Sequence, residues 1–292
     1  MPEPGLWPTA TRKPNTKKPS PKPKESSMPS TNYAYVNGHF VRETEARVPI
    51  SDRGFLYGDG VFETMRVYDG HVFRALEHFE RLRAGLEMLE IEALLSPAEL
   101  HAVCRALIRW NNVRDGVARV YRTRDSIVAT VIERSFPPRE LRAMVSTLPL
   151  HAFLSRHKTA NRLVYQLAQR AAQREGADEA VLLDPNGSVI EFTTGNLFAV
   201  KRGELFTPPL RDGPLPGITR AVVLSLARAM GIRVHEISLP PAFLEQADEV
   251  FATNSLYEIA PVVTWSKRRS VTQKLREAYR DLVRFELNTP AP

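Results

Sequence analysis

Cysteine is nearly absent from the sequence, since only Cys104 occurs among 292 residues. A single cysteine cannot form an intramolecular disulfide and has no second thiol with which to build a metal site. Cys104 lies in "LHAVCRALIRW", where apolar residues recur with helical spacing, and free cysteine packs as a small hydrophobe. We therefore expect Cys104 in the core of the protein and not at a reactive site.

Long hydrophobic runs are also missing. None approaches the roughly 20 apolar residues that a membrane helix needs, and the N-terminus has neither an apolar signal core nor a small-residue cleavage site. With 43% hydrophobic residues the chain can still build one large core or two modest ones. These features predict a soluble globular protein in the cytoplasm, with no membrane partner.

Several catalytic motifs do not occur. The seven histidines include no pair spaced four residues apart, so we expect no metal site. The sequence contains neither the "G-x-S-x-G" turn of serine hydrolases nor the "GxxxxGK[ST]" phosphate loop. Serine-hydrolase and P-loop chemistries are therefore not expected.

Positive charge is concentrated at the N-terminus. The net charge is +7, and residues 1–31 supply +4 of it through six Lys/Arg and two Glu. The same segment holds eight of the 23 prolines, and such a Pro/Lys-rich composition cannot bury enough apolar surface to offset its ordering entropy. We expect a disordered basic tail over 1–31. Because the remainder is nearly balanced in charge, nucleic acid is not expected as the principal partner.

The first part of the remaining chain combines hairpins with helices. Asn37-Gly38 and Asp69-Gly70 each separate two strand patterns and are strong hairpin signals. The other predicted elements are helices over 76–89 and 97–112 and strands over 117–122, 127–133 and 142–147. We predict a small α+β domain over 32–148, and an extended crossing segment that continues to Lys158.

The second part has more strands. A Pro/Gly-rich loop leads into a helix over 218–231 that ends on Gly231, where a C-terminal cap is expected. The other predicted elements are four strands within 179–208, strands over 233–239, 249–254 and 260–265, a short helix over 242–247 and a terminal helix over 271–287. We predict a large α+β domain over 149–292, and hence an α+β fold of two lobes with a cleft between them.

Two glycine-containing segments could approach a ligand. Gly217 precedes a helix start at Ile218-Thr219, and unsatisfied backbone N–H groups at such a start bind phosphate well. An ordinary loop-to-helix junction explains the same pattern. The "GDG" of residues 58–60 indicates a sharp turn that closely approaches something, although a simple tight turn fits equally.

Four charged residues are ambiguous when each is considered alone. Glu191 falls at the end of a strand pattern, where a surface carboxylate is the simpler interpretation. Arg81 and Arg83 lie on an amphipathic helix, on which arginines usually face water. Lys158, in "SRHKTANRL", is by its residue type either a solvated cation or a chemical group.

The order of these segments resembles the class IV aminotransferases, the fold-type IV family of pyridoxal-phosphate enzymes. The family includes branched-chain and D-amino-acid transaminases and aminodeoxychorismate lyase. The resemblance runs from about Tyr33 to about Val263. It rests on "DRGFLYGDGVFET", "EHFERL", "KTANRL", "GADEAVLLDPNGSVIEFTTGNLF", "LPGITR" and "ADEVFATNSLYEIAPV".

The resemblance implies a role for each of the candidate residues. Lys158 would form a Schiff base with pyridoxal 5′-phosphate, and Glu191 would pair with the pyridine nitrogen. Arg81 would bind the phosphate. The other phosphate contacts that the family implies are Ile218, Thr219, Asn254 and Ser255.

The implied function is that of a transaminase that moves an amino group between an amino acid and a 2-oxo acid. Lys158 would act as general base and acid at the substrate Cα, while the cofactor carries the carbanion chemistry. The alternative within the family is aminodeoxychorismate lyase, which eliminates pyruvate with the same lysine and cofactor. The family also implies a homodimer.

Three departures from the family pattern leave the substrate open. Asn161 lies three residues beyond the lysine and is followed by Arg162-Leu163, which differs from the branched-chain branch and is more similar to the D-amino-acid and lyase branches. Phe62, a predicted substrate contact, stands where the D-amino-acid branch has an aromatic hydroxyl. The strand-loop segment that clamps the substrate carboxylate is abbreviated, with Arg122 and Arg124 as candidates.

Overall fold

The computed structural model describes residues 32–289 of the chain. The basic segment 1–31, predicted to be disordered, lies outside these residues. Strands and helices occur in groups along the described part, and the predicted α+β class is confirmed. The elements that position the functional site come from both halves of the sequence.

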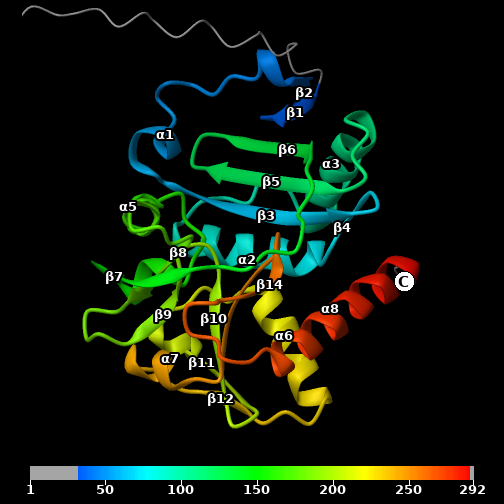
Figure 1. The fold of residues 1–292 in the computed structure, drawn as a ribbon. Helices are drawn as coiled ribbons and strands as arrows, with labels where there is room; N and C mark the ends of the chain where they lie inside the picture. Colours follow the sequence, from blue (N-terminus) through cyan, green and yellow to red (C-terminus); the bar gives the residue numbers. More distant parts are fainter. Residues whose placement is uncertain (1–31, 290–292) are drawn as a thin grey trace, which may run out of the picture. The chain divides into compact units, whose positions relative to one another are not determined.

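The N-terminal half forms a six-stranded antiparallel sheet (Figure 1). Its strands, in the spatial order β2-β1-β6-β5-β3-β4, are β1 (Tyr33–Val36), β2 (His39–Arg42), β3 (Gly60–Tyr68), β4 (His71–Val72), β5 (Gly116–Thr123) and β6 (Ile127–Glu133). The predicted hairpins at Asn37-Gly38 and Asp69-Gly70 are confirmed. All four turn residues have positive φ, between 44° and 93°, as two-residue turns of the primed type require.

Two helices pack against this sheet, close to the ranges that the apolar spacing predicts. They are α2 (Ala75–Met88) and α3 (Pro97–Trp110). A capping box starts α3, in which Ser96 and Glu99 each accept the other's backbone N–H. The helices and strands share one core that contains Phe79, Cys104 and Leu107. Cys104 is fully buried there, as predicted.

The C-terminal half contains two smaller sheets. One is three-stranded, in the order β7-β8-β9, and the other is five-stranded, in the order β12-β11-β10-β13-β14. Their strands are β7 (Ala143–Pro149), β8 (Glu179–Leu183), β9 (Val189–Phe192), β10 (Asn196–Lys201), β11 (Glu204–Thr207), β12 (Val234–Glu236), β13 (Glu249–Asn254) and β14 (Glu258–Pro261).

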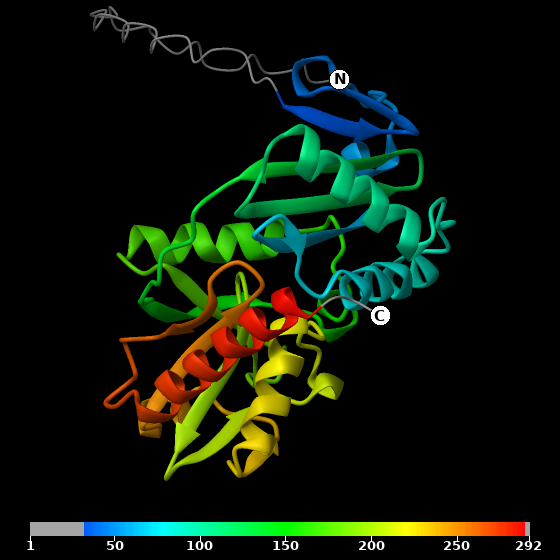
Figure 2. The same cartoon turned by 90° about the vertical axis from the view of Figure 1, so that its right-hand side faces the viewer.

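Helices cover these sheets. The helix α5 (Leu163–Arg174) packs on β7 and β8. The helices α6 (Ile218–Ala229) and α8 (Ser270–Asn288) lie side by side against the five-stranded sheet (Figure 2). The remaining helices of the described part are α1 (Arg53–Tyr57), α4 (Ala152–Ser155) and α7 (Ala242–Gln246), with 3-10 turns at Glu43–Glu45 and Leu210–Asp212. No helix in the described part is long and apolar enough to cross a membrane. The cytoplasmic location stays a prediction.

The connection between the two halves differs from the expected one. The strand predicted over 142–147 exists as β7, but it pairs in parallel with β8 and so extends a sheet of the second half. The segment predicted to be extended up to Lys158 contains the short helix α4. The division into domains 32–148 and 149–292 stays a prediction.

Candidate active site

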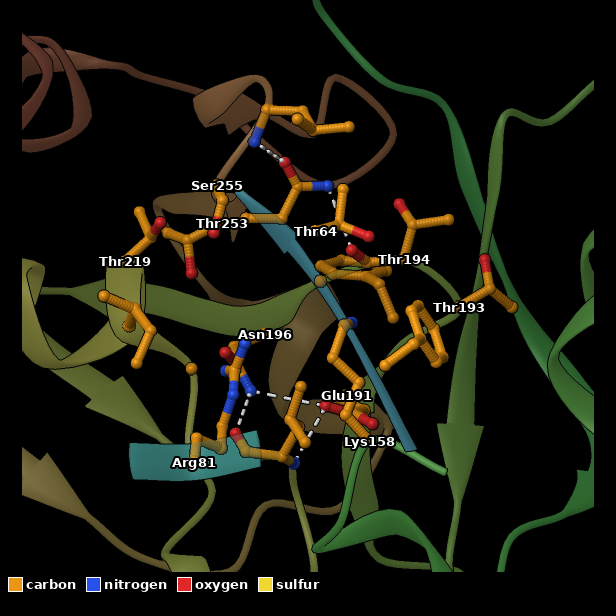
Figure 3. Close-up of a pocket in the computed structure, with 18 of the residues that line it drawn as sticks. Thr64, Arg81, Lys158, Glu191, Thr193, Thr194, Asn196, Thr219, Thr253 and Ser255 are labelled. Carbon is orange, nitrogen blue, oxygen red and sulfur yellow. Dashed lines mark hydrogen bonds between the residues drawn. The ribbon is translucent and has the colours of Figure 1, made fainter. Parts of the chain in front are cut away.

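A pocket lies where β3 and α2 meet β9, the start of α6 and the β13–β14 turn (Figure 3). Its volume is about 250 Å³. Eight of the residues predicted to bind the cofactor or the substrate line this pocket. These residues are Phe62, Arg81, Lys158, Glu191, Ile218, Thr219, Asn254 and Ser255. The fold therefore brings together six segments that are far apart in the sequence.

Backbone pairing with the start of β3 positions Lys158. Its carbonyl accepts the N–H of Phe62 at 2.9 Å, Thr159 forms a bridge with Val61, and Ala160 N–H donates to Gly60 at 2.8 Å. The lysine amine Nζ lies 4.7 Å from the centroid of the Phe62 ring. A short stretch of sheet-like pairing thus holds Lys158 over an aromatic face in the pocket.

The environment of Lys158 favours the neutral amine. Burial and the nearby cations Arg81 and Arg162 together lower the pKa of Lys158 to about 7, against the opposite influence of Glu63 and Glu191. Among residues 32–289, no carboxylate lies within ion-pair distance of Nζ. A large share of the amine is therefore unprotonated at neutral pH, as a nucleophilic lysine requires.

Glu191 is a buried carboxyl group at the end of β9 and not the surface residue of the simpler interpretation. It accepts hydrogen bonds from Tyr165 Oη at 3.0 Å, Asn196 Nδ2 at 3.3 Å and Leu215 N–H at 3.0 Å. Burial raises the pKa of Glu191 to about 7, although Arg162 and the hydrogen bonds from Leu215 and Tyr165 act in the opposite direction. Glu191 therefore presents an oriented carboxyl group to the pocket.

Two hydrogen bonds to the buried carboxylate of Glu63 on β3 fix the position of Arg81. Its Nε and one terminal nitrogen donate to the two oxygens of Glu63, each at 2.7 Å, and the other terminal nitrogen donates to Pro216 O at 3.0 Å. His78 Nδ1 also lies 2.7 Å from Glu63. Arg83, by contrast, forms exposed ion pairs along its own helix. Of the two arginines on α2, only Arg81 faces the pocket.

The start of α6 offers uncapped backbone N–H groups to the pocket. Gly217 is its N-cap, and no side chain of the described residues caps it. A Cβ at Gly217 would lie 1.9 Å from Asn196 Oδ1, so only glycine fits at this approach. Ile218 and the buried Thr219 follow directly. Uncapped N–H groups that face a pocket are typical of an anion-binding site, and an ordinary loop-to-helix junction does not explain them.

The β13–β14 turn contributes hydroxyl groups. Asn254 Oδ1 accepts the backbone N–H groups of Leu256 and Tyr257, both at 2.9 Å, so the Asn254 side chain shapes the turn that presents Ser255. Thr253 Oγ1 is buried and has no hydrogen-bond partner within the described part of the chain. An unsatisfied buried hydroxyl that lines a pocket indicates a ligand that completes its hydrogen bonding.

The model of the family "Amino-transferase class IV" matches residues 60–265, which include all of these pocket segments. The chain belongs to this family. The prediction made from the ordered motifs is thereby confirmed, and the protein is an enzyme of the aminotransferase type. Enzymes of this family depend on pyridoxal phosphate.

Relatives of this class IV aminotransferase are similar over most of their length. A putative branched-chain-amino-acid aminotransferase from Methanocaldococcus jannaschii is 38% identical, over 85% of this chain and 95% of that protein. The branched-chain-amino-acid aminotransferase of Salmonella typhimurium is 33% identical, over 85% and 92%. A D-alanine aminotransferase from Staphylococcus haemolyticus is 28% identical, over 84% and 95%.

Solved structures share the fold of this class IV aminotransferase. The Escherichia coli branched-chain aminotransferase matches with a TM-score of 0.81 and 30% identity, over 87% of this chain and 95% of that one. A putative 4-amino-4-deoxychorismate lyase from Legionella pneumophila has a TM-score of 0.77 and 29% identity, over 82% and 96%. Another branched-chain aminotransferase, solved with pyridoxamine 5′-phosphate, has a TM-score of 0.81 and 27% identity, over 87% and 94%.

In this class IV aminotransferase the "GDG" turn approaches its own chain. A Cβ at Gly58 would lie 2.5 Å from Asn161 Oδ1, and one at Gly60 would lie 2.8 Å from Arg122 O. Asn161 Nδ2 also donates to Gly58 O at 3.0 Å. The turn therefore holds the lysine segment against β3, and neither Gly58 nor Gly60 lines the pocket.

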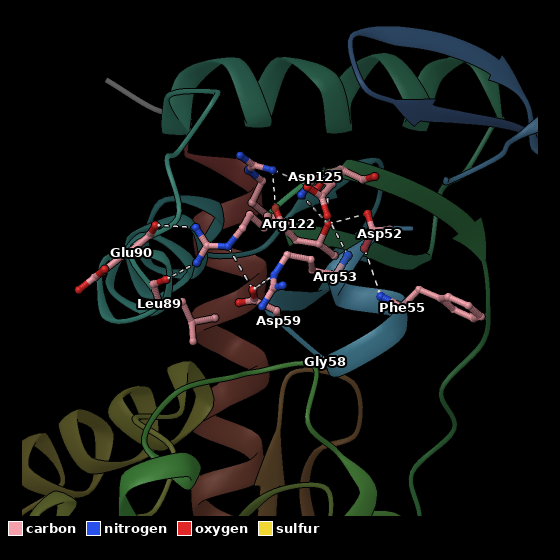
Figure 4. A network of polar contacts seen from close by, with 12 residues as sticks. Asp52, Arg53, Phe55, Gly58, Asp59, Leu89, Glu90, Arg122 and Asp125 are labelled. Carbon is pink, nitrogen blue, oxygen red and sulfur yellow. Dashed lines mark hydrogen bonds and ion pairs between the residues drawn. The ribbon is translucent and has the colours of Figure 1, made fainter. Parts of the chain in front are cut away.

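The two arginines proposed for the substrate carboxylate do not line the pocket. Arg122 is buried and donates to the backbone oxygens of Glu92 and Ser126. Arg124 pairs with Asp59 and donates to the carbonyls of Leu89 and Glu90, just beyond the end of α2. Figure 4 labels these three partners. Both arginines thus support the frame around α1 and the "GDG" turn, and neither is placed to contact a ligand in this pocket.

Arg119 also lines the pocket, although its position in the sequence did not single it out. It pairs with Thr64 across the β3–β5 ladder, two positions from the Phe62–Tyr121 pair, so both pairs share one face of the sheet. Its Nε is buried without a hydrogen-bond partner among residues 32–289. Strand alternation places Arg119 and Arg122 on opposite faces of the sheet. Which of the two faces the pocket follows only from the register of β5 with β3.

Proposed function

We propose that this enzyme is a pyridoxal 5′-phosphate-dependent transaminase that moves an amino group between an amino acid and a 2-oxo acid. One observation carries the proposal. Lys158, whose pKa is about 7, shares a pocket with the buried carboxyl group of Glu191 and with Arg81 at the uncapped start of α6. A reactive amine, an acid and an anion site are what this cofactor requires of a protein.

The chemical groups that line the pocket fit the cofactor. At the phosphate end lie Arg81, Thr219, Ser255 and the N–H groups of the α6 start, and the unpartnered Thr253 hydroxyl faces the same space. Such donors match the acceptor oxygens of a phosphate. Asn254 contributes by fixing the turn from which Ser255 projects.

Glu191 and Lys158 would contact the pyridine-ring end of the cofactor. Glu191 would hold a proton on the ring nitrogen, because its carboxylate is oriented by three donors and balanced by a cation. The bound cofactor supplies the electron sink that stabilises negative charge at the substrate Cα. Lys158 Nζ would hold the cofactor as a nucleophile. Once the substrate amine has displaced it, the free Lys158 amine would act as the base that takes the proton from the substrate Cα.

Arg119 is the group best suited to the carboxylate of the substrate. It lines the pocket on the same face of the sheet as Phe62, and its unsatisfied Nε offers a charged donor. Apolar side chains of Phe62, Leu215 and Leu256 line the remaining wall. A pocket of this composition favours amino acids with apolar side chains, in agreement with the names of the branched-chain relatives.

The enzyme would act as a homodimer. Phe55, Tyr57 and Leu163 are 72%, 64% and 66% exposed, which is unusual for three large apolar residues so close together. The bond from Asn161 to Gly58 ties the end of α1 to the start of α5, so these residues share one side of the structure (Figure 1). A second copy of the chain is the occupant that would cover this face beside the pocket.

An amino-transfer assay tests the proposed reaction. The purified protein, supplied with pyridoxal 5′-phosphate, should convert 2-oxoglutarate to glutamate with L-leucine or L-valine as donor. D-alanine should be the poorer donor. Release of pyruvate from aminodeoxychorismate without any 2-oxo acid, together with no amino transfer, would favour the lyase and overturn the transaminase. The lyase stays the alternative because its structural neighbour shares the fold at a TM-score of 0.77.

A further inference from the structure

A buried histidine connects two of the anion-binding residues from outside the pocket. His78 Nδ1 lies 2.7 Å from Glu63 Oε2, and His78 Nε2 lies 3.3 Å from Ser255 Oγ. Glu63 in turn holds Arg81 through two hydrogen bonds. Arg81 and Ser255 line the pocket, whereas His78 and Glu63 are 1% and 0% exposed behind it.

The contacts of His78 determine where its ring proton lies when no anion is bound. Arg81 and His78 hold the pKa of Glu63 well below its usual range, despite the burial that would raise it. Glu63 is therefore an ionised carboxylate that only accepts hydrogen bonds. Nδ1 must carry the proton of a neutral ring, so Nε2 presents a lone pair and the Ser255 hydroxyl must donate to it.

This arrangement conflicts with anion binding by Ser255. A serine hydroxyl has a single proton, and when that proton points to His78, the hydroxyl turns only lone pairs toward the pocket. The other neutral tautomer does not help, because it would set an Nδ1 lone pair against the Glu63 carboxylate at 2.7 Å. Only the doubly protonated ring donates to Glu63 and to Ser255 at once, which frees the hydroxyl proton for an anion.

We infer that a phosphate group binds in this pocket together with one proton, which His78 Nε2 takes up from solvent. His78 is then a positioning residue, because it acts through Ser255 and Glu63 and does not touch the ligand. The inference rests on the proposed function for the identity of the phosphate compound. The charges support it, since Glu63 and Arg81 already balance each other and the added proton offsets part of the phosphate charge.

The electrostatic surroundings keep the ring neutral until the anion arrives. Burial lowers the pKa of His78, Glu63 raises it, and the cations Arg81 and Lys158 lower it. An anion beside Ser255 would counter those two cations and so favour protonation. Because a proton is bound with the ligand, affinity should fall as pH rises, by up to about tenfold per pH unit.

Titration of the full-length, cofactor-free enzyme with pyridoxamine 5′-phosphate tests this coupling. This compound lacks the carbonyl group that would react with Lys158. Calorimetry in two buffers of different ionisation enthalpy measures how many protons are taken up when the ligand binds. We expect about one proton near pH 8. If no proton is bound, the heat of binding should be the same in both buffers. The phosphorus resonance should show the bound phosphate as the dianion, which excludes the phosphate as the group that takes up the proton.

Two matched substitutions assign the proton to His78. His78→Asn keeps a donor near Glu63 but has no group at Nε2, so proton uptake should vanish and affinity at pH 7 should fall about tenfold or more. His78→Gln can place an amide N–H near Ser255, so uptake should vanish while affinity stays within about threefold. Proton uptake that persists in either variant would overturn the inference.

Nitrogen NMR of the wild-type enzyme gives a readout that needs no variant. The Nε2 resonance of His78 should move to the protonated range when pyridoxamine 5′-phosphate binds, and a resonance that does not move contradicts the inference. Binding without proton uptake sinks the role of His78 and leaves the proposed function standing. No binding at any pH overturns both.

Discussion

Arg81 and Glu63 form a two-pronged ion pair inside the protein, with both N···O distances at 2.7 Å. The pair joins α2 to β3, and Glu63 is fully buried. It occupies Nε and one proton of a terminal nitrogen, and the other terminal nitrogen donates one proton to Pro216 O. One proton on each terminal nitrogen remains for a ligand. The ion pair therefore gives Arg81 a fixed orientation before any anion binds.

Loss of the Glu63 charge should destabilise the cofactor-free protein. Glu63→Gln leaves the Arg81 cation buried without a counter-charge, and the free energy of unfolding should fall by about 3–5 kcal/mol in urea titrations. Glu80→Gln, which removes an exposed partner of Arg83 on the same helix, is the matched control and should cost about 1 kcal/mol or less. Equal losses in the two variants would contradict the account.

The effect of Glu63→Gln should also depend on pH. Because the folded protein holds the pKa of Glu63 below the value of 4.5 for a free carboxyl group, its contribution is fully present above about pH 4.5 and declines as pH falls below it. The stability difference between wild type and variant should therefore be constant from about pH 6 to 8 and shrink in acid. Urea titrations across this range measure it.

The attachment of the cofactor to Lys158 should follow the titration of its amine. Since the pKa of Lys158 is about 7, the rate at which cofactor-free protein binds pyridoxal 5′-phosphate should rise through about pH 7 and level off above about pH 8. Stopped-flow absorbance measures this rate. A rate that still rises toward about pH 10 would mean that the amine has an ordinary pKa.

Arg119 should matter for the substrate and Arg124 should not. Arg119→Gln removes the charged donor from the pocket, so kcat/KM for the amino donor should fall by about 10- to 100-fold, with the cofactor still bound. Arg124→Gln removes a charge of the same kind from the outer frame and should change kcat/KM by less than about threefold. Comparable losses would show that the pocket assignment of Arg119 is wrong.

The exposed face of α1 should control the oligomeric state. Phe55→Ser should convert the expected dimer to a monomer in light-scattering chromatography, because it removes a large apolar side chain from the proposed interface. Phe285→Ser is the control, since Phe285 is 66% exposed and belongs to α8, which lies away from α1 (Figure 1). A monomeric wild type, or a dimer lost only in the control, would contradict the proposed interface.

Local signals in the sequence predicted most elements of the fold. The hairpins at Asn37-Gly38 and Asp69-Gly70 followed from residues that tolerate positive φ, and α2 and α3 followed from their apolar spacing. The partner of β7 could not be predicted, because strand pairing depends on contacts between distant segments. The short helix α4 is too brief to leave a periodic pattern.

The residues of the pocket could be predicted from the sequence only in part. Lys158, Glu191 and Arg81 stood out through the order of the motifs, and all three line the pocket. Arg119 was missed because the face of a strand residue follows from register, which the sequence leaves open. His78 was missed because its meaning depends on tertiary contacts with β3 and with the β13–β14 turn.

The central claim is that Lys158 carries the cofactor. Protein supplied with pyridoxal 5′-phosphate should turn yellow, and borohydride should remove the visible absorbance and fix the cofactor to a single lysine. Mass spectrometry of the digested protein should then find the modification on Lys158, and Lys158→Ala should take up the cofactor without being labelled. A colourless protein, or label spread over the exposed lysines with Lys158 unmodified, would contradict the account.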